Sequence, residues 1–219
     1  GYDPLAFAIE ECHKRGMECH AWFVTFPVGT EKHVKEMGKR SVVRKHPKLC
    51  KRHNGEWYLD PGVPGTADYL LSLVKEIVEG YDIDGIHFDY IRYPEEAKTF
   101  PDSKLYNQSG KKRPLADWRR ENINRMVYRF YDYVKQVKPW VQVSSSPLGK
   151  YSRIEQVPNA GWTAYESVYQ DPKRWLEAGK QDMLVPMMYY LHKNFFPFVD
   201  NWVSLSNGRL IVPGLGAYR

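Results

Sequence analysis

The sequence predicts an α/β fold, and three observations lead to it. Strand-like and helix-like segments alternate along the 219 residues, which is typical of parallel strands joined by helical crossovers. About five such strand-helix pairs are recognisable from their periodicity. The chain opens on a helix and ends on a strand, which is unusual for an open sheet. We therefore expect most of a (β/α)8 barrel, with upstream strands and the last strand absent.

The first elements begin near the N-terminus. Asp3-Pro4 is typical of a helix start, because Asp caps the first free N–H groups and Pro suits the first helical position. Gly16 then ends that helix. The run Cys19–Phe26 is strand-like, and a long polar segment to about Gly65 reads as a loop.

The middle of the chain contains two helices and two strands. Apolar residues at helical spacing over Leu70–Val78 predict a helix that Gly80 closes. Ile83–Ile91 alternates as a strand does, and Asp117–Val137 has apolar residues along one helical face. Val141–Ser146 is again strand-like.

The last quarter continues the alternation. A short helix is expected over Asp171–Gly179, and a weaker one over Phe198–Leu205. The last two strands are expected over Met183–Tyr190 and Leu210–Leu215. Because this length suits one core, we expect a single domain over residues 1–219.

Composition excludes several classes of protein. Hydrophobic residues make up 42% and charged residues 26% of the chain, so it is neither disordered, nor collagenous, nor a small disulfide scaffold. No apolar run approaches the roughly 20 residues that span a bilayer, and no export signal precedes the first helix. Aromatic residues reach 15%, and their flat apolar faces suit sugar rings as well as cores. Nothing in the sequence indicates an oligomeric state.

The net charge of +6 is concentrated in loops. Lys and Arg cluster in His33–His53 and around Lys111–Arg113, while the rest is nearly balanced. A nucleic-acid binder needs a basic stripe tied to a recognition element, and none is present, so we expect no nucleic-acid partner. Contact between the basic loop and an acidic polymer stays open.

The cysteines and histidines were weighed as metal ligands. Cys12, Cys19 and Cys50 form no C-x-x-C pair. His46, Cys50 and His53 share one loop and have suitable side chains for zinc, but we favour the simpler explanation, a polar loop that contains two histidines. We expect no metal and no cofactor.

The chemistry is expected at the carboxyl ends of the strands, where parallel barrels gather their active sites. Alternation along Ile83–Ile91 places Ile86 and Phe88 toward helices, and His87 and Asp89 toward the barrel interior. Asp89 lies near the strand end, within reach of a substrate. A salt bridge between Asp89 and Arg92 is the structural alternative.

Other strands add polar and aromatic side chains to the same inner face. These are His20 and Trp22, Gln142, Ser144 and Ser146, and Met187 and Tyr189. Such a bowl with a central carboxylate is what a glycosidase needs, together with a second carboxyl that protonates the leaving oxygen. For both His20 and His87 the alternative role is that of a buried histidine bonded to its neighbours.

The chain also resembles a known family. It contains, in order, YDPLAFAIEECHKRGMECHAWF, YDIDGIHFDYIRYP, DWRRENIN, SSSPLG, QDPKRWLEAGKQDMLVPMMYY and GLGAYR. Together these resemble the glycosyl-hydrolase-like family 10, a bacterial group. The resemblance implies a (β/α)8 barrel related to sugar-cleaving enzymes, usually exported as lipoproteins or periplasmic proteins. It also implies two strands before this segment and an eighth strand after it.

Two departures from familiar patterns matter. Many members of the family have a second Asp after the one that matches Asp89, and this chain has Tyr90 there. The strand also resembles the chitinase motif D-G-x-D-x-D-x-E, but Ile91 replaces its acidic Glu. A chitinase-type mechanism is therefore not expected. Glu166 is the first candidate for the general acid, Asp60 the next, and a residue upstream of this segment a third.

The sequence thus predicts a glycoside hydrolase of a bacterial glycan, with peptidoglycan strands as one candidate substrate. Asp89 and Glu166 are the predicted catalytic residues. The predicted substrate-binding residues are His20, Trp22, His87, Arg92, Tyr93, Ser146, Tyr189 and Tyr218. The alternative is a non-catalytic carbohydrate-binding barrel. From the resemblance we expect a periplasmic, cell-surface or secreted location.

Overall fold

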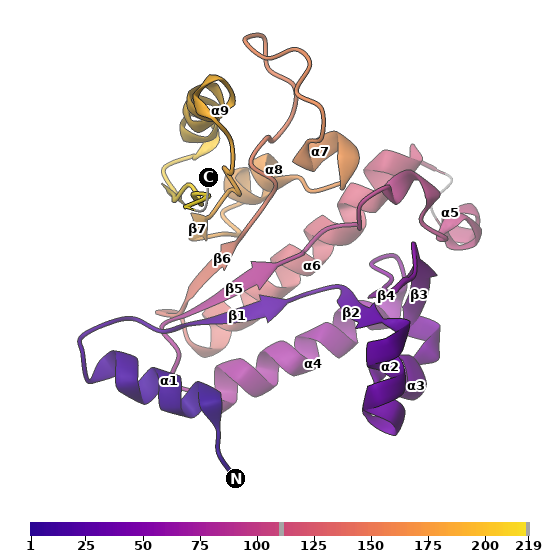
Figure 1. Cartoon of the computed structure of the whole chain (residues 1–219), viewed down its shortest axis with the longest axis vertical. Helices are drawn as coiled ribbons and strands as arrows, with labels where there is room; N and C mark the ends of the chain where they lie inside the picture. Colours follow the sequence, from indigo (N-terminus) through magenta and orange to yellow (C-terminus); the bar gives the residue numbers. More distant parts are fainter. Residues whose placement is uncertain (110–111, 218–219) are drawn as a thin grey trace.

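A computed structural model describes residues 1–109 and 112–217 of the chain. Its centre is a five-stranded parallel sheet (Figure 1). The strands, in spatial order, are β1 (His20–Val24), β5 (Gly85–Asp89), β6 (Gln142–Ser145), β7 (Met183–Leu184) and β8 (Leu210–Ile211). Neighbours in space are also successive parallel strands, so the sheet is a section of a barrel wall. The α/β prediction is confirmed.

Helices connect these strands. The longer ones are α1 (Pro4–His13), α4 (Pro64–Gly80), α6 (Leu115–Val137) and α9 (His192–Leu205), with the short α8 (Pro172–Glu177) before β7. Helices α4 and α6 pack against each other and run along the outer face of the sheet (Figure 1). None of the helices among the described residues has the length and apolar character needed to cross a membrane.

The core lies between the sheet and its helices. Ile86 and Phe88 are almost fully buried, as alternation along the strand predicts. The Phe88 ring stacks on Phe130 of α6, with centroids 5.3 Å apart, and meets Phe23 of β1 edge-on at 5.7 Å. The opposite, inner face of β5 is left to His87 and Asp89.

The helix caps follow the predicted signals. The Asp3 carboxylate accepts hydrogen bonds from the Leu5 and Ala6 N–H groups, each at 3.1 Å. Asp171 caps α8 in the same way. Helix α9 begins at His192, earlier than the apolar pattern over Phe198–Leu205 suggests. Pro197 lies inside the helix as its sixth residue, where the missing N–H removes one hydrogen bond of the helix.

The polar segment after β1 is not a loop, and that prediction was wrong. Residues 27–59, called here the insertion, form an antiparallel sheet with helices beside it. Its elements are β2 (Pro27–Thr30), α2 (Glu31–Met37), η1 (Gly38–Arg40), α3 (Val42–Lys45), η2 (Pro47–Leu49), β3 (Cys50–His53) and β4 (Glu56–Leu59). A signal for the hairpin existed: Asn54-Gly55 joins β3 and β4 with positive φ at both residues, as tight hairpins prefer.

The last strands are shorter than expected. Regular pairing in β7 and β8 ends at Leu184 and Ile211, while isolated bridges join Leu148 to Met187 and Met187 to Gly214. Pro186 and Pro213 follow closely, and proline has no N–H to donate to a ladder. The polypeptide still follows the barrel wall beyond the regular strands.

The loops after β5 and β6 contain short helices. These are η3 (Ala97–Thr99), α5 (Ser103–Ser109) and α7 (Ala164–Ser167). Arg119 of α6 anchors the loop that follows β5. Its guanidinium makes a two-pronged ion pair with Asp102 at 2.9 and 2.7 Å, and it also donates to the Ala97 carbonyl and the Tyr169 hydroxyl. Both charged side chains are fully buried.

Candidate functional site

Asp89 is the last residue of β5, where parallel sheets present their functional groups. Its Oδ1 accepts hydrogen bonds from the Ser146 hydroxyl and the Tyr90 backbone N–H, each at 2.7 Å. Its Oδ2 accepts a longer one, 3.2 Å, from the Trp22 indole. Three strands or strand ends therefore hold one half-buried carboxylate in a fixed orientation. The sequence brought these residues together correctly on one face.

Below Asp89 on the same face lies a histidine–serine pair. The His87 Nδ1 and the buried Ser144 hydroxyl are 2.8 Å apart. Burial lowers the pKa of His87, and the negative charge of Asp89 offsets part of this decrease. At neutral pH the imidazole is therefore uncharged. It lies next to Asp89 on the inner face of β5, as a neutral polar group.

Trp22 and His20 share the inner face of β1 but lie at different heights. Trp22 pairs in register with His87, and its side chain is 68% exposed, so its indole faces the open bowl beside Asp89. His20 pairs with Gly85 at the other end of the sheet and contacts Glu18 at 3.0 Å. The structure thus places Trp22 at the strand-end site and His20 away from it.

Arg92 does not form the salt bridge with Asp89 that was the structural alternative. Instead its guanidinium lies between two rings, 4.9 Å from the Tyr90 centroid and 5.3 Å from that of Trp162. Only 7% of Arg92 is exposed, and burial lowers its pKa below the ordinary arginine value. Tyr90, the residue at the family's second Asp position, has a left-handed φ of 50°, a strained conformation for a tyrosine.

Tyr93 was predicted to shape a sugar subsite, but the structure buries its ring completely. The ring packs edge-on against Phe100 and Tyr169, at 5.3 and 5.5 Å. Its hydroxyl accepts a hydrogen bond from Asn122 at 3.5 Å. The physical reason is that the regular strand ends at Asp89, earlier than the expected Ile91, so strand alternation no longer decides which way the later side chains point.

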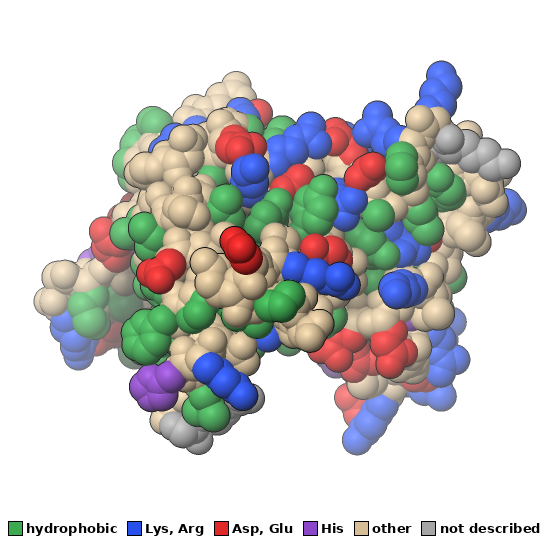
Figure 2. Space-filling model, turned by 90° about the horizontal axis from the view of Figure 1, so that it is seen from above, with side chains coloured by type: hydrophobic (Ala, Val, Ile, Leu, Met, Phe, Trp, Pro, Cys, Tyr) green, Lys and Arg blue, Asp and Glu red, His purple; other side chains and the backbone are tan. Residues whose placement is uncertain are grey.

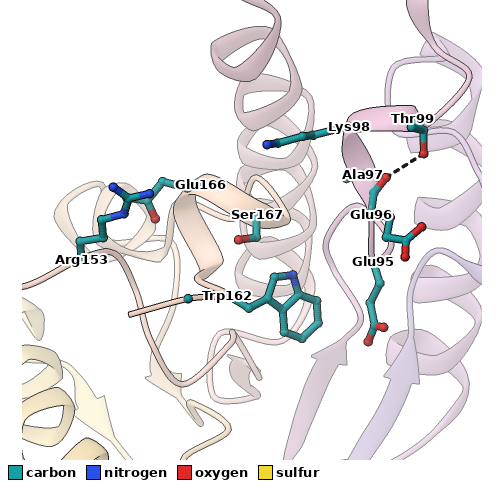
Figure 3. A pocket seen from close by; sticks show the side chains of 10 residues that line it. Glu95, Glu96, Ala97, Lys98, Thr99, Arg153, Trp162, Glu166 and Ser167 are labelled. Atoms are coloured by element: carbon teal, nitrogen blue, oxygen red, sulfur yellow. Dashed lines mark hydrogen bonds between the residues drawn. The ribbon is translucent and has the colours of Figure 1, made fainter. Parts of the chain in front are cut away.

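Two hollows open beside this end of the sheet. The large hollow, about 710 Å³, is lined by Glu95–Thr99 and by Arg153, Gly161, Trp162, Glu166 and Ser167. Figure 3 shows the Trp162 indole between the Glu95 side and the Glu166–Arg153 side. The small hollow, about 430 Å³, is lined by Val24, Pro27, His53, Asn54, Glu56, Tyr58, Tyr90 and Arg92–Glu96. Asp89 is not among the lining residues of either hollow, but Val24, its register partner on β1, and Tyr90, its neighbour in the chain, line the small hollow.

Glu166 lies in the wall of the large hollow, but it also has a structural role. Thr163 caps α7 by accepting from the Glu166 N–H at 3.3 Å, and its hydroxyl bonds back to the Glu166 carboxylate. The Thr163 backbone N–H donates instead to the Ser167 hydroxyl at 3.1 Å, so Thr163 caps the helix and also holds the Glu166 carboxylate through its side chain. Glu95, which sequence reasoning did not select, lines both hollows. Its position in the loop that directly follows β5 was the available signal.

Asp60, the second candidate acid, lies elsewhere. Its side chain is fully buried, and its Oδ1 accepts from the Gly62 N–H at 2.9 Å, which makes it a turn residue. Its Oδ2 is buried without a hydrogen-bond partner. Burial raises the pKa of Asp60 to about 6, and the nearby Asp102 adds to that rise.

The remaining predicted residues divide as follows. Ser146 bonds Asp89 directly. Tyr189 follows β7 on the same side of the sheet and is 36% exposed. Tyr218 lies outside the described residues.

The three side chains weighed as a metal site have separate partners. The Cys50 thiol lies 3.7 Å from the His46 carbonyl, and burial raises its pKa to about 11. His53 contacts the Glu95 carbonyl at 3.0 Å. Across the described ranges, no cluster of three or more His, Cys, Asp and Glu side chains has the arrangement of a metal site.

Sequence comparison identifies relatives. The family described as Glycosyl hydrolase-like 10 matches residues 1–201. The chain is 35% identical over 201 residues to glycosyl hydrolase YngK of Bacillus subtilis, which covers 87% of this chain and 39% of that protein. It is 33% identical over 205 residues to glycosyl hydrolase DigH of Escherichia coli, which covers 87% and 47%. The chain thus spans less than half the length of these relatives.

Structure comparison supports the same architecture. The glycoside hydrolase domain of PgaB (BpsB) from Bordetella bronchiseptica superposes with a TM-score of 0.62, over 96% of this chain and 64% of that one. The two sequences are 11% identical, so this likeness concerns the fold. It supports the interpretation of the five-stranded sheet with its helices as part of a barrel.

Proposed function

Because the chain belongs to the glycosyl hydrolase-like 10 family, we propose that it cleaves glycosidic bonds in a bacterial glycan by carboxylate chemistry. One observation carries the proposal. The Asp89 carboxylate stands at the carboxyl end of β5, oriented by Ser146, Trp22 and a backbone N–H, and the neighbouring Tyr90 lines the small hollow.

Asp89 suits the role of nucleophile or charge stabiliser. A glycosidase needs a carboxylate aimed at the sugar carbon where positive charge develops. Bonds from Ser146 and Tyr90 to Oδ1 prevent rotation of the carboxyl group, so Oδ2 meets the substrate in one orientation. Such fixed orientation lowers the barrier because the group does not reorganise during reaction.

A second carboxyl has to protonate the leaving oxygen. We propose Glu166 or Glu95 for this step, since both line the large hollow on opposite sides of Trp162 (Figure 3). Glu95 belongs to the loop that follows Asp89, and Glu166 to a helix after β6. The uncharged His87 lies under Asp89 and supports it through polarity rather than by proton transfer.

Sugar rings would bind along aromatic faces. Trp22 is 68% and Trp162 41% exposed. The Trp22 indole contacts Asp89, and the Trp162 ring contacts the Arg92 guanidinium. Flat apolar rings of this kind suit the faces of pyranose sugars. Peptidoglycan glycan strands are our first candidate substrate.

Product analysis tests the proposal. The full-length protein is incubated with peptidoglycan glycan strands and a panel of polysaccharides, and released fragments are separated by mass. Asp89→Asn should lower the cleavage rate by roughly 10²- to 10⁴-fold while glycan binding persists. Asp82→Asn, at an exposed residue before the same strand, is the matched control and should leave the rate unchanged. Absence of cleavage on every substrate would refute the enzyme proposal.

A non-catalytic carbohydrate-binding barrel is the second candidate. It is favoured by Tyr90 at the family's second Asp position and by the hydrogen bond between the Glu166 carboxylate and the Thr163 hydroxyl. This candidate predicts that the parent protein binds glycans without releasing any product. The same incubation, read by binding as well as by mass, distinguishes the two.

The location follows from the family resemblance. We propose that the protein acts in the periplasm or at the cell surface, where its glycan would be found. Fractionation of cells that produce the full-length protein tests this, and recovery only with cytoplasmic markers would contradict it.

A further inference from the structure

We propose that Arg92 is a binding site for a carboxylate of the substrate, so that the glycan is an acidic one. This inference rests on the proposed function, because it names the substrate class of the same site. Arg92 lies three residues after Asp89 and lines the small hollow together with Tyr90.

The first observation is a buried guanidinium without an anionic partner. Arg92 is 7% exposed, and its Nε is buried with no hydrogen-bond acceptor. Its Nη1 donates to the Tyr93 carbonyl at a long 3.4 Å. No ion pair joins Arg92 to a carboxylate within the ranges that the structure describes. A charge held in this way destabilises the fold, which is typical of a group reserved for a ligand.

The protein's other buried arginine shows what such a site accepts. Arg119 also lies over two tyrosine rings, Tyr93 at 5.2 Å and Tyr169 at 5.0 Å. There the Nε edge is filled by the Asp102 carboxylate, at 2.9 Å from Nε and 2.7 Å from Nη2. Arg92 also lies over two aromatic rings, but its Nε has no acceptor from the described part of the protein. The chemistry that fits it is a carboxylate bound through two parallel N–H groups.

The rings around Arg92 hold it ready. The guanidinium carbon lies over the rings of both Tyr90 and Trp162, and these two contacts hold the group in place. The left-handed φ of Tyr90 is the backbone cost of this arrangement. Since the guanidinium is already ordered, little entropy is lost when an anion binds.

The acidic side chains near Arg92 do not occupy this role. Glu56 accepts from the Tyr58 hydroxyl at 2.8 Å, and Glu96 from the Asn54 amide at 3.0 Å. Glu95 is exposed at the rim, where solvent screens its charge. Glu95 and Asp89 raise the pKa of Arg92, which keeps the guanidinium charged, although burial acts more strongly in the other direction.

The charge of the insertion favours the same substrate class. Residues 27–59 contain nine Lys and Arg but three Glu, which is a net +6 and equals the net charge of the whole chain. Figure 2 shows side chains of both signs interspersed over one face of the molecule. The insertion supplies Pro27, His53, Asn54, Glu56 and Tyr58 to the small hollow, and none of its Lys or Arg is among the described lining residues. Its positive charge therefore acts at long range, by attracting an anionic polymer toward this part of the molecule.

Binding measurements with three probes test the inference. The full-length protein carrying Asp89→Asn, which removes cleavage, is titrated calorimetrically with three ligands. These are neutral chitooligosaccharides, oligogalacturonate with a ring carboxylate, and peptide-free peptidoglycan strands with a lactyl carboxylate. At least one acidic probe should bind more tightly than the neutral one. The acidic probe that does so identifies the source of the carboxylate.

Substitution then assigns the effect to Arg92. Arg92→Met keeps the length and the contact with both rings, and should raise the Kd of the acidic probe roughly 10- to 100-fold without changing that of the neutral probe. Arg92→Lys keeps the charge but not the fork, and should give an intermediate loss. The control is Arg120→Met, since Arg120 also stacks on a tyrosine, Tyr165 at 3.9 Å, but is paired with Asp117. The control should change neither Kd.

Several results would overturn the inference. Tighter binding of the neutral probe would do so, and so would an equal loss for all probes in Arg92→Met with its melting temperature preserved. Failure of the proposed function looks different: no glycan is cleaved by the parent, yet acidic probes still bind and Arg92→Met still weakens them.

Discussion

Asp60 makes the stability of this protein depend on pH in a direction opposite to that of most carboxylates. Its side chain is fully buried, one oxygen has no partner, and burial raises its pKa from 3.8 to about 6. A raised pKa means that the folded state prefers the protonated acid. The stabilising effect is present below the unfolded pKa, and is lost as pH rises through the folded pKa.

The magnitude follows from the two pKa values. Between 3.8 and about 6, at about 1.4 kcal/mol for each pKa unit, the ionised form costs about 3 kcal/mol of folding stability at neutral pH. Asp60→Asn abolishes this dependence, because the amide does not ionise. Its Oδ1 can still accept from the Gly62 N–H, so the turn is kept.

Urea unfolding at pH 4, 6 and 8 measures the effect. The free energy of unfolding of the parent, relative to that of Asp60→Asn, should fall by about 2–3 kcal/mol from pH 4 to pH 8. Comparison at each pH cancels any fixed cost of burying the amide. Asp82→Asn, at an exposed position, is the control and should follow the parent. Parallel curves for the parent and Asp60→Asn would refute the reasoning.

Three further predictions concern single contacts. Asp102→Asn leaves the buried Arg119 guanidinium uncompensated, and should lower the free energy of unfolding by roughly 3–5 kcal/mol; a loss below 1 kcal/mol in urea unfolding would contradict this. Gly85→Ala brings a Cβ to 2.4 Å from the His20 ring and should cost about 1–3 kcal/mol, most of it recovered in a double variant with His20→Ala. Trp22→Phe removes the indole bond to Asp89, and should lower kcat about fivefold on whichever glycan is cleaved; an unchanged kcat would argue against a role for that bond.

Residues that lie within strands were predictable, because their environment is decided by period-two alternation. The pattern in β5 placed Ile86 and Phe88 against helices and His87 and Asp89 inside, and the structure confirms this. The same reasoning brought Ser146 and Trp22 to Asp89. In all these cases one sheet fixes both the direction and the height of each side chain.

Residues beyond the strand ends were not predictable in this way. Arg92 and Tyr93 follow β5 by three and four residues, yet one lines the small hollow under two rings and the other fills the core. Their directions depend on the left-handed turn at Tyr90 and on Trp162, some seventy residues away. The insertion was missed for a related reason: its helices and strands span three to seven residues each, too few for a periodic pattern to show.

Among the described residues, two buried ionisable side chains each have a polar atom that the fold leaves without a partner. These atoms are Arg92 Nε, in the wall of the small hollow, and Asp60 Oδ2, in the turn that Asp60 forms with Gly62. Arg119 and Asp102, by contrast, satisfy each other. Burial of an unpartnered ionisable group lowers stability, so each of the two groups is costly until it takes up a proton or binds a counter-ion. Asp60 can relieve its cost by taking up a proton, whereas arginine stays charged in proteins. Binding of an external anion therefore offsets the cost of burying Arg92, whereas Arg119 already has the Asp102 carboxylate as its partner. For this reason Arg92→Met should weaken the binding of acidic probes.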